Sequence, residues 1–259
     1  MIHKLSLVHK NAKVGKKTKI GPFCTIGRNV KIGDDCILHS HINIQGDSVI
    51  GDNTEIFPFV SIGSIPQDLK YKGEKTKIKI GSNCKIREYV TVNIGTKGGG
   101  KLTSIGNNCL LMIGTHVAHD CLIGNNVIFA NHSTLAGHVV INDNVVVGAL
   151  SAIHQFSRIG EGAMIGGMSG VTADVVPFAT VMGNRAKLSG LNILGLKRRL
   201  TKKKEIAELR NVFKYIFYEK NSTLKTRIID IKKKHYKEKT IKVLLDFLSS
   251  DSERSLILP

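Results

Sequence analysis

An aliphatic side chain returns at every sixth position through most of the first 171 residues. The series begins at Val8, keeps its phase to Val92, and then runs one residue out of phase from Ile105 to Val171. A period of six matches neither the 3.6-residue turn of an α-helix nor the two-residue alternation of a strand. It does match a short strand followed by a turn. Three such units would close a triangular coil of 18 residues, so we predict a prism of stacked parallel strands with the aliphatic side chains inside.

The fifth position of each six-residue unit also points inward, where space is short, and it carries small side chains. All five cysteines occupy this position. We therefore interpret them as small buried hydrophobes, not as a disulfide framework or as metal ligands. The residues at this position include Ala12, Thr18, Ser48, Thr54, Ser133, Ser151, Ala163 and Ser169, together with Cys24, Cys36, Cys84, Cys109 and Cys121.

Glycine often follows the aliphatic residue, and Asn or Asp often comes next, as in Gly51-Asp52-Asn53. Because Gly and Asn tolerate positive φ, we assign these residues to the corners of the prism. Hexapeptide repeats of this kind are typical of the left-handed parallel β-helix. The left hand is taken from that resemblance, because parallel crossovers are ordinarily right-handed. The predicted fold is mainly β, with residues 1–187 forming a left-handed parallel β-helix of hexapeptide repeats.

Two segments do not follow the repeat, residues 64–79 and residues 94–104. We predict that both leave the prism as excursion loops. Loops on a rigid scaffold are favoured places for binding residues. The second segment contains the glycine-rich run Gly95–Lys101, which matches neither a P-loop nor a dinucleotide-binding fingerprint.

Beyond Leu188 the hydrophobic pattern becomes helical, so residues 188–259 are predicted to form an α-helical C-terminal domain. A helix over 202–219 has Thr201 as a candidate N-cap and an apolar stripe from Ile206 to Phe217. Two shorter helices are predicted around Leu224–Lys234 and Ile241–Leu248. We expect this domain to cover the open end of the solenoid, to present a partner surface, or both.

Composition narrows the choice of partner and compartment. The formal net charge is +18, most concentrated in residues 190–259, and such a surface attracts nucleic acid, anionic lipid or an acidic protein. Aromatic residues make up only 5 %, and they are poorly interleaved with the basic residues, which argues against nucleic acid as a partner. No stretch approaches the roughly 18 apolar residues of a membrane span, and we see no signal peptide. We therefore expect a cytoplasmic protein with no membrane span.

Histidines are dense in the second half of the chain, and the 18-residue coil orders them. Asp120 and His138 are 18 residues apart and therefore share a face on adjacent coils, with His119 beside Asp120 and His116 nearby. Imidazoles next to a carboxylate suit a general base, because the carboxylate fixes the tautomer and stabilises the imidazolium. Spacing alone leaves two other interpretations open, ordinary solvent-facing histidines and a metal site. We expect no metal.

Several segments in and around this cluster are similar to one known family. They resemble the UDP-N-acetylglucosamine O-acyltransferases, which perform the first step of lipid A synthesis with acyl carrier protein as the donor. The hexads alone are shared by many acetyltransferases, so the specific signal lies in the segments between and beyond them. These are Gln67-Asp68-Leu69-Lys70-Tyr71, His116-Val117-Ala118-His119-Asp120-Cys121, Leu135-Ala136-Gly137-His138-Val139, Ile153-His154-Gln155-Phe156, Asn192-Ile193 and Gly195-Leu196-Lys197-Arg198-Arg199.

The resemblance implies a role for each matching residue. His119 is expected to take the proton from the sugar 3-hydroxyl, Asp120 to orient it, and the backbone N–H of Gly137 to stabilise the oxyanion. The freed oxygen would attack the thioester directly, so no cofactor is expected. Sugar, phosphate and nucleotide contacts are expected from Gln67, Asp68, Lys70, His116, His138, His154, Gln155, Asn192, Arg198 and Arg199.

The same resemblance implies an acyl-length determinant and two protein partners. Gly167, with Met168 beside it, matches the position that limits acyl length, and a glycine there leaves room for a long chain. The family is a homotrimer with its active sites between subunits. Acyl carrier protein is acidic, and the candidate docking charges are Lys202, Lys203, Lys204 and Arg210, whose alternative interpretation is a solvated helix face.

Four positions depart from the family pattern. Asn93-Ile94 stands where His-Arg is frequent, Leu194 where an acidic residue is frequent, and Arg185 where a His is frequent. Leu194 removes a possible nucleotide contact, so details of acceptor binding are in doubt. None of these positions touches the expected base.

Other functions remain open on the sequence. One is an acetyl-CoA-dependent hexapeptide acetyltransferase, and another is the related N-acyltransferase, which carries an additional N-terminal uridine-binding domain that has no room before Val8. A third is a non-enzymatic β-helix scaffold or nucleic-acid binder. The acyl length and the nature of the acceptor 3-position, hydroxyl or amine, are also left open.

Overall fold

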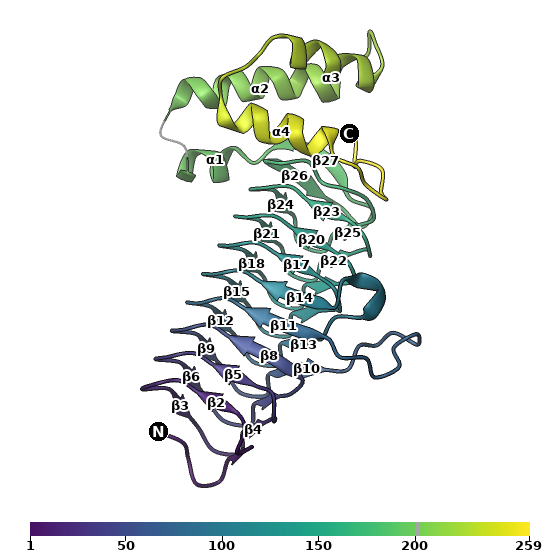
Figure 1. Ribbon diagram of the computed structural model, residues 1–259. Coiled ribbons are helices and arrows are strands. Elements are labelled where there is room, and N and C mark those ends of the chain that lie inside the picture. Colours follow the sequence, from purple (N-terminus) through teal and green to yellow (C-terminus); the bar gives the residue numbers. More distant parts are fainter. Residues whose placement is uncertain (200–201) are drawn as a thin grey trace.

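The computed structural model describes residues 1–199 and 202–259, and it shows a triangular prism closed at one end by helices (Figure 1). Three parallel sheets form the faces of the prism, and each coil contributes one short strand to each sheet. Residues 18 apart are paired along the prism, for example Leu110 with Ile128 and His116 with Thr134. The prediction of a left-handed parallel β-helix of hexapeptide repeats followed by a helical region is confirmed.

The strands are mostly two residues long, and they are grouped here by sheet. The first sheet contains β1 Leu7–Val8, β4 Thr25–Ile26, β7 Asn43–Ile44, β10 Ser61–Ser64, β13 Thr91–Asn93, β16 His116–Val117, β19 Thr134–Leu135, β22 Ala152–Ile153 and β25 Gly170–Val171. The second contains β2 Lys13–Val14, β5 Lys31–Ile32, β8 Asp47–Ile50, β11 Lys77–Ile80, β14 Leu102–Ile105, β17 Leu122–Ile123, β20 Val140–Ile141 and β23 Arg158–Ile159. The third contains β3 Lys19–Ile20, β6 Ile37–Leu38, β9 Glu55–Ile56, β12 Lys85–Ile86, β15 Leu110–Leu111, β18 Ile128–Phe129, β21 Val146–Val147, β24 Met164–Ile165, β26 Ala179–Met182 and β27 Lys187–Leu191.

The interior of the prism is filled as the repeat predicts. From Ile20 onward the aliphatic residues of the repeat are buried, while Val8 and Val14 at the open end are half-buried. All five cysteines are buried and free. Burial raises the pKa of the Cys121 thiol to about 12, which keeps it protonated and unreactive. The interpretation of the cysteines as small core residues is confirmed.

The corners follow a different rule from the one predicted. Positive φ falls on the third residue after the inward aliphatic one, such as Asn126 (φ 56°) or Asp120 (φ 59°), and not on the glycine that directly follows it. That glycine is required because the next coil passes close by: a Cβ on Gly21 would lie 2.6 Å from the carbonyl oxygen of His39. Assigning these glycines to positive φ was therefore wrong, and the close stacking of the coils explains them.

The interruptions of the repeat lie between β10 and β11 and between β13 and β14, and the second contains the short 3₁₀ helix η1 (Lys97–Gly99). Across them, Ile80 pairs with Ile50 and with Ile105, at separations of 30 and 25 residues instead of 18. The first insertion is a multiple of six and the second exceeds six by one residue. This difference accounts for the one-residue phase shift of the repeat.

The helical region begins later than the hydrophobic pattern predicts. Residues 187–191 form β27, which pairs antiparallel with β26, and the first helix is α1 (Ile193–Arg199). It is followed by α2 (Lys203–Tyr218), α3 (Leu224–Lys233) and α4 (Lys239–Ser249). The candidate N-cap Thr201 lies outside the described residues. The apolar stripe of α2 is buried as predicted, except that Ile206 is only half-buried.

After α4 the chain returns to the prism, beside β23 and β25 (Figure 1). Leu256 forms a parallel bridge with Asp174, and the Leu188 N–H donates to the Leu258 carbonyl. The buried carboxylate of Asp174 also accepts hydrogen bonds from Arg158 (2.8 Å) and Ser252 (2.7 Å). The C-terminal segment is thus part of the last coils and does not hang free.

Candidate active site

The cluster predicted from histidine spacing forms at one corner of the prism, the one that follows the strands of the first sheet. Asp120, His138 and Phe156 occupy equivalent positions on three successive coils, each with positive φ. His138 stacks on Phe156 with ring centroids 4.5 Å apart, and it meets His119 edge-to-face at 5.1 Å. We call this edge of the prism the catalytic corner. Both excursions leave the prism along it.

His119 and Asp120 form a hydrogen-bonded pair. The distance from His119 Nδ1 to Asp120 Oδ2 is 2.8 Å, the Asp120 side chain is fully buried, and that of His119 is 14 % exposed. An ionised carboxylate can only accept, so the imidazole donates from Nδ1 and carries its lone pair on Nε2. This arrangement leaves Nε2 as a proton acceptor.

Gly137 lies directly against this imidazole. A Cβ at residue 137 would lie 2.5 Å from His119 Cε1 and 2.7 Å from Nε2, so a larger residue would displace the ring. Among the described residues we find no acceptor for the Gly137 N–H. A free backbone donor beside the proposed base suits an oxyanion contact.

Two further histidines surround the pair. His116 Nδ1 lies 2.7 Å from Thr91 Oγ1, and His138 Nε2 lies 4.0 Å from Asp120 Oδ2. Burial lowers the pKa of His116, and the charge of His119 lowers it further. Burial also lowers the pKa of His138, although Asp120 opposes this effect. Both imidazoles are therefore favoured in the neutral form at neutral pH, in which each can donate one hydrogen bond and accept another.

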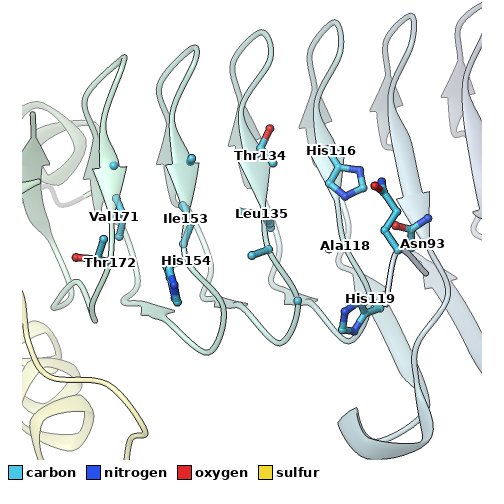
Figure 2. A pocket seen from close by; sticks show the side chains of 15 residues that line it. Asn93, His116, Ala118, His119, Thr134, Leu135, Ile153, His154, Val171 and Thr172 are labelled. Atoms are coloured by element: carbon cyan, nitrogen blue, oxygen red, sulfur yellow. The ribbon is translucent and has the colours of Figure 1, made fainter. Parts of the chain in front are cut away.

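A groove of about 670 Å³ runs from His119 along the face of the first sheet (Figure 2). It crosses four coils, which at about 4.8 Å per strand span roughly 14 Å. The outward residues on its floor are small, so an extended chain can lie against the strands. The groove residues are Gln67, Asn93, His116, Ala118, His119, Thr134, Leu135, Ala136, Gly137, Ala152, Ile153, His154, Gly170, Val171 and Thr172.

A second cavity of about 830 Å³ opens on the other side of the catalytic corner. The first excursion contributes Asp68 and Lys70, and the prism contributes His138 and Phe156. Gln67, one residue earlier, faces the groove instead. The two cavities therefore flank the His119–Asp120 pair, with polar residues of the first excursion reaching both.

The structure does not bring Asn192, Arg198 and Arg199 to this corner. In Figure 1 helix α1, which carries both arginines, lies on the opposite side of the prism from the excursions. Asn192 caps α1 by accepting from the Gly195 N–H (2.9 Å), and its amide donates to the Gly162 carbonyl (3.0 Å). Burial lowers the pKa of the Arg199 guanidinium, which packs against Gly162. Within one chain, Asn192 and Arg199 make structural contacts.

The C-terminal segment holds a residue that the sequence reasoning missed. Arg254 Nη2 lies 2.9 Å from His154 Nδ1, and Arg254 Nε donates to the Gln155 carbonyl at 3.0 Å. His154 and Gln155 are the expected nucleotide contacts on the prism. No local sequence signal could have found Arg254, because it lies about 100 residues from both.

The remaining expected residues lie outside the groove. Gly167 and the 72 % exposed Met168 lie at the corner that precedes β25, on the far edge of the grooved face. A Cβ on Gly167 would make only ordinary contact with Ala149, at 3.4 Å, so a side chain fits there. Of the departures from the family pattern, Leu194 and Arg185 are exposed. Asn93 is buried, with its amide donating to the Ile65 carbonyl at 3.2 Å.

A third cavity, of about 1510 Å³, lies between β27, α1 and α2. Its floor includes Ile193 and Phe213, and Lys203 and Arg210 are among the basic residues at its edge. Lys204 instead pairs with Glu208 at 3.8 Å along α2, and Lys202 is exposed at the N-cap of that helix. Two of the four candidate docking charges thus share one basic, apolar-floored cavity.

Metal coordination is geometrically conceivable at the catalytic corner. Ligand atoms of His119, Asp120 and His138 lie within 4.8 Å of one another. Asp120 Oδ2, however, already accepts from His119 Nδ1, which occupies one potential ligand atom of each residue. A metal-free site therefore stays our prediction. Across residues 1–199 and 202–259, no helix combines the length and the apolar character needed to cross a membrane.

Comparison with known families agrees with this arrangement. Residues 174–257 match the family described as "Udp N-acetylglucosamine O-acyltransferase; Domain 2". Residues 11–41 and 102–137 match "Bacterial transferase hexapeptide (six repeats)". The two descriptions cover the two structural parts of the chain.

Relatives in sequence and structure extend over the whole chain. The acyl-[acyl-carrier-protein]–UDP-N-acetylglucosamine O-acyltransferase of Azorhizobium caulinodans is 43 % identical over 259 residues, covering 100 % of this chain and 95 % of its own. The enzyme of the same name from Rickettsia typhi is 46 % identical, covering 98 % and 96 %. A solved UDP-N-acetylglucosamine acyltransferase from Campylobacter jejuni superposes with a TM-score of 0.95 at 37 % identity, covering 100 % of both chains.

Proposed function

Because this chain belongs to the acyl-carrier-protein-dependent UDP-N-acetylglucosamine O-acyltransferase family of lipid A biosynthesis, we propose that it acylates the 3-position of UDP-N-acetylglucosamine. The donor is a 3-hydroxyacyl thioester of acyl carrier protein. The observation that carries the proposal is the buried His119–Asp120 pair, which leaves an imidazole lone pair at the mouth of an apolar-floored groove. The resemblance of sequence supports the choice of substrates.

The reaction needs one proton acceptor and no cofactor. His119 Nε2 takes the proton of the sugar 3-hydroxyl as its oxygen attacks the thioester carbonyl carbon. Asp120 stabilises the imidazolium, and the Gly137 N–H stabilises the oxyanion of the tetrahedral intermediate. Collapse of that intermediate breaks the C–S bond and expels the thiolate of the carrier, to which His119 returns the proton. The products are the ester and free thiol carrier protein.

Binding is divided between the two cavities and the groove. Asp68, Lys70 and His138 face the second cavity, where they are suited to hold the sugar and its phosphate. The acyl chain lies along the groove, over the small outward residues of the first sheet. Gly167 stands at the far edge of that face, where an added side chain meets no close neighbour.

Gly167 offers a direct test of the acyl path. We expect Gly167→Met to shift the preferred donor to a shorter acyl chain, because the new side chain would project into the space the chain tail occupies. Donors of several lengths compared at equal concentration would reveal the shift. Identical chain preference in the variant and the parent would refute a length-limiting role.

The nucleotide contacts require a second copy of the chain. Asn192, Arg198 and Arg199 line neither cavity beside His119, so a neighbouring subunit of the proposed homotrimer supplies them. The acyl carrier protein docks at the basic cavity around Lys203 and Arg210, whose charge suits an acidic partner. A cytoplasmic location is part of the same proposal.

A transfer assay tests the proposal. The protein is incubated with UDP-N-acetylglucosamine and 3-hydroxyacyl carrier protein, in parallel with acetyl-CoA as the donor, and the product is identified by mass spectrometry. We expect acyl transfer from carrier protein and an ester product. Transfer from acetyl-CoA alone would favour a hexapeptide acetyltransferase, and no transfer from either donor would favour a scaffold.

The base has its own variant and control. His119→Ala is expected to lower kcat by at least about 10²-fold, the lower end of general-base contributions. His132→Asn, at an exposed corner with positive φ, keeps the parent rate because Asn tolerates the same backbone conformation. An unchanged rate in His119→Ala would remove this residue from its role.

A further inference from the structure

The glycine-rich segment 95–101 touches the catalytic pair directly. The Thr96 N–H donates to Asp120 Oδ1 at 2.8 Å, and the Thr96 hydroxyl donates to Asp120 Oδ2 at 2.6 Å. Thr96 is 5 % exposed and Asp120 is 4 % exposed, so both bonds are shielded from water. Hydrogen bonds to an ionised group in a dry environment are among the stronger ones in proteins.

The glycines of this segment let its backbone lie on the carboxylate. A Cβ on Gly95 would sit 2.9 Å from Asp120 Oδ1, and one on Gly99 would overlap the carboxylate carbon itself. Gly98, the neighbour of Gly99, has nothing within 4 Å of its Cβ position. Neither Gly98 nor Gly99 has positive φ, so the close approach to Asp120, and not backbone conformation, requires the glycine at position 99.

Two more contacts fix the segment in place. The Asp120 N–H donates to Thr103 Oγ1 at 2.8 Å, which anchors the backbone of Asp120 to the far end of the second excursion. The Lys97 N–H donates to Glu74 Oε1 at 3.1 Å, and the Lys72 N–H donates to Glu74 Oε2 at 2.9 Å. Glu74 therefore ties the two excursions together. The loop that carries Asp68 and Lys70 is linked in this way to the loop that holds Asp120.

These bonds leave Asp120 one orientation. Oδ1 is held by the Thr96 backbone, and Oδ2 is shared between the Thr96 hydroxyl and His119 Nδ1. We propose that the segment 95–101 is a positioning element which, through Thr96, locks the Asp120 carboxylate so that His119 keeps its proton on Nδ1 and its lone pair on Nε2. The kinetic consequence rests on the proposed function, in which Nε2 is the base. The tautomer itself does not.

The kinetic test compares three variants. Thr96→Val removes the hydroxyl and keeps the side-chain shape, so we expect kcat to fall roughly 10- to 100-fold with KM for the nucleotide sugar within about twofold. Thr96→Ser retains the hydroxyl and should recover most of the rate. Thr54→Val removes an equally buried hydroxyl that donates to Gly81 in a distant coil, and it controls for general destabilisation with kcat within about twofold.

A double-mutant comparison separates positioning from mere stability. If Thr96 acts through Asp120, then Thr96→Val should cost less than about threefold in an Asp120→Asn background, because the group it positions is already lost. The same fold loss in both backgrounds, or an unchanged kcat in Thr96→Val alone, would overturn the proposal. A matched pair in the same loop adds a steric test: Gly99→Ala should lower kcat at least about tenfold and Gly98→Ala less than about twofold.

The last arm needs no substrate. In protein labelled with ¹⁵N-histidine, the imidazole nitrogen shifts report the tautomer of His119. We expect Nδ1–H in the parent and a substantial Nε2–H population in Thr96→Val. An unchanged tautomer in the variant would overturn the positioning role even if the transfer assay had failed, and a changed tautomer without transfer activity would leave it standing while the proposed function fell.

Discussion

Two corners of the same prism show how one repeat serves two purposes. At the corner that follows the second sheet, Asp and Asn side chains cap the backbone N–H groups of the neighbouring coil, as when Asn125 N–H donates to Asp143 Oδ1 at 2.7 Å. We call this the ladder corner; its other acceptors are Asp34, Asp52 and Asn107. At the catalytic corner, Asp120 has the same positive φ as Asn126 of the ladder corner. Its carboxylate, however, binds an imidazole and an excursion loop.

The difference lies in what the acceptors leave unpaired. Along the ladder corner each side-chain acceptor is used up by backbone donors, so the corner is chemically inert and contributes to stability. At the catalytic corner the acceptor takes the Nδ1 proton, and the basic nitrogen Nε2 of His119 is left beside a groove. Reactivity here therefore depends on which partner the carboxylate has, since the backbone is the same in both places.

Exchanging Asp for Asn at each corner should break the comparison most sharply. Asp120→Asn is expected to lower kcat by roughly 10²- to 10⁴-fold, because the amide can neither hold the same tautomer nor stabilise an imidazolium. Asp143→Asn keeps an acceptor oxygen for the Asn125 N–H and should leave kcat within about twofold. Steady-state kinetics of both variants decides this, and equal losses in the two would remove the distinction between the corners.

Adding one methyl group to a glycine at each corner should give effects of different kinds. Gly137→Ala places Cβ against the His119 ring, so we expect kcat to fall at least about tenfold with a nearly unchanged melting temperature. Gly124→Ala would overlap Asp143 Oδ1 and should lower stability by about 1–3 kcal/mol while leaving kcat intact. Kinetics and thermal unfolding of both proteins provide the measurement. A stability loss in Gly137→Ala with unchanged kcat would contradict the assigned contact.

The smallest effect is a dependence of stability on pH. Burial lowers the pKa of His116 and His138 in the folded protein, so the unfolded chain binds more protons just below the ordinary imidazole value of about 6.5. Their contribution to stability is intact above that value and is lost as pH falls through the lower, folded value. The ladder corner contains no such group. We expect His116→Asn to reduce the fall in melting temperature between neutral and mildly acidic pH, and an unchanged fall would assign it to other groups.

The prism and the catalytic corner were predictable because both follow from periodicity. The six-residue period gave the interior positions, and the 18-residue coil placed His138 over Asp120 before any coordinates were considered. The family resemblance then supplied the roles of His119 and Gly137. Periodicity could not give the reason for the glycines after each aliphatic residue, since that reason is the closeness of the next coil.

The features that sequence could not supply are contacts between segments without a common period. The second excursion has no repeat to fix its path, so the bond from Thr96 to Asp120, 24 residues apart, left no pattern. The contact between Arg254 and His154 joins residues 100 positions apart. The strand β27 was missed because its apolar residues also fit a helical stripe, and pairing with β26 decides between the two.

The most direct test of the account is a structure of the protein with UDP-N-acetylglucosamine bound. We predict that the sugar 3-oxygen lies within hydrogen-bond reach of His119 Nε2, about 2.6–3.2 Å, with Nδ1 still bonded to Asp120. An acceptor sugar bound at another face of the prism, or one whose 3-oxygen faces away from His119, would contradict the assignment of this corner as the place of reaction.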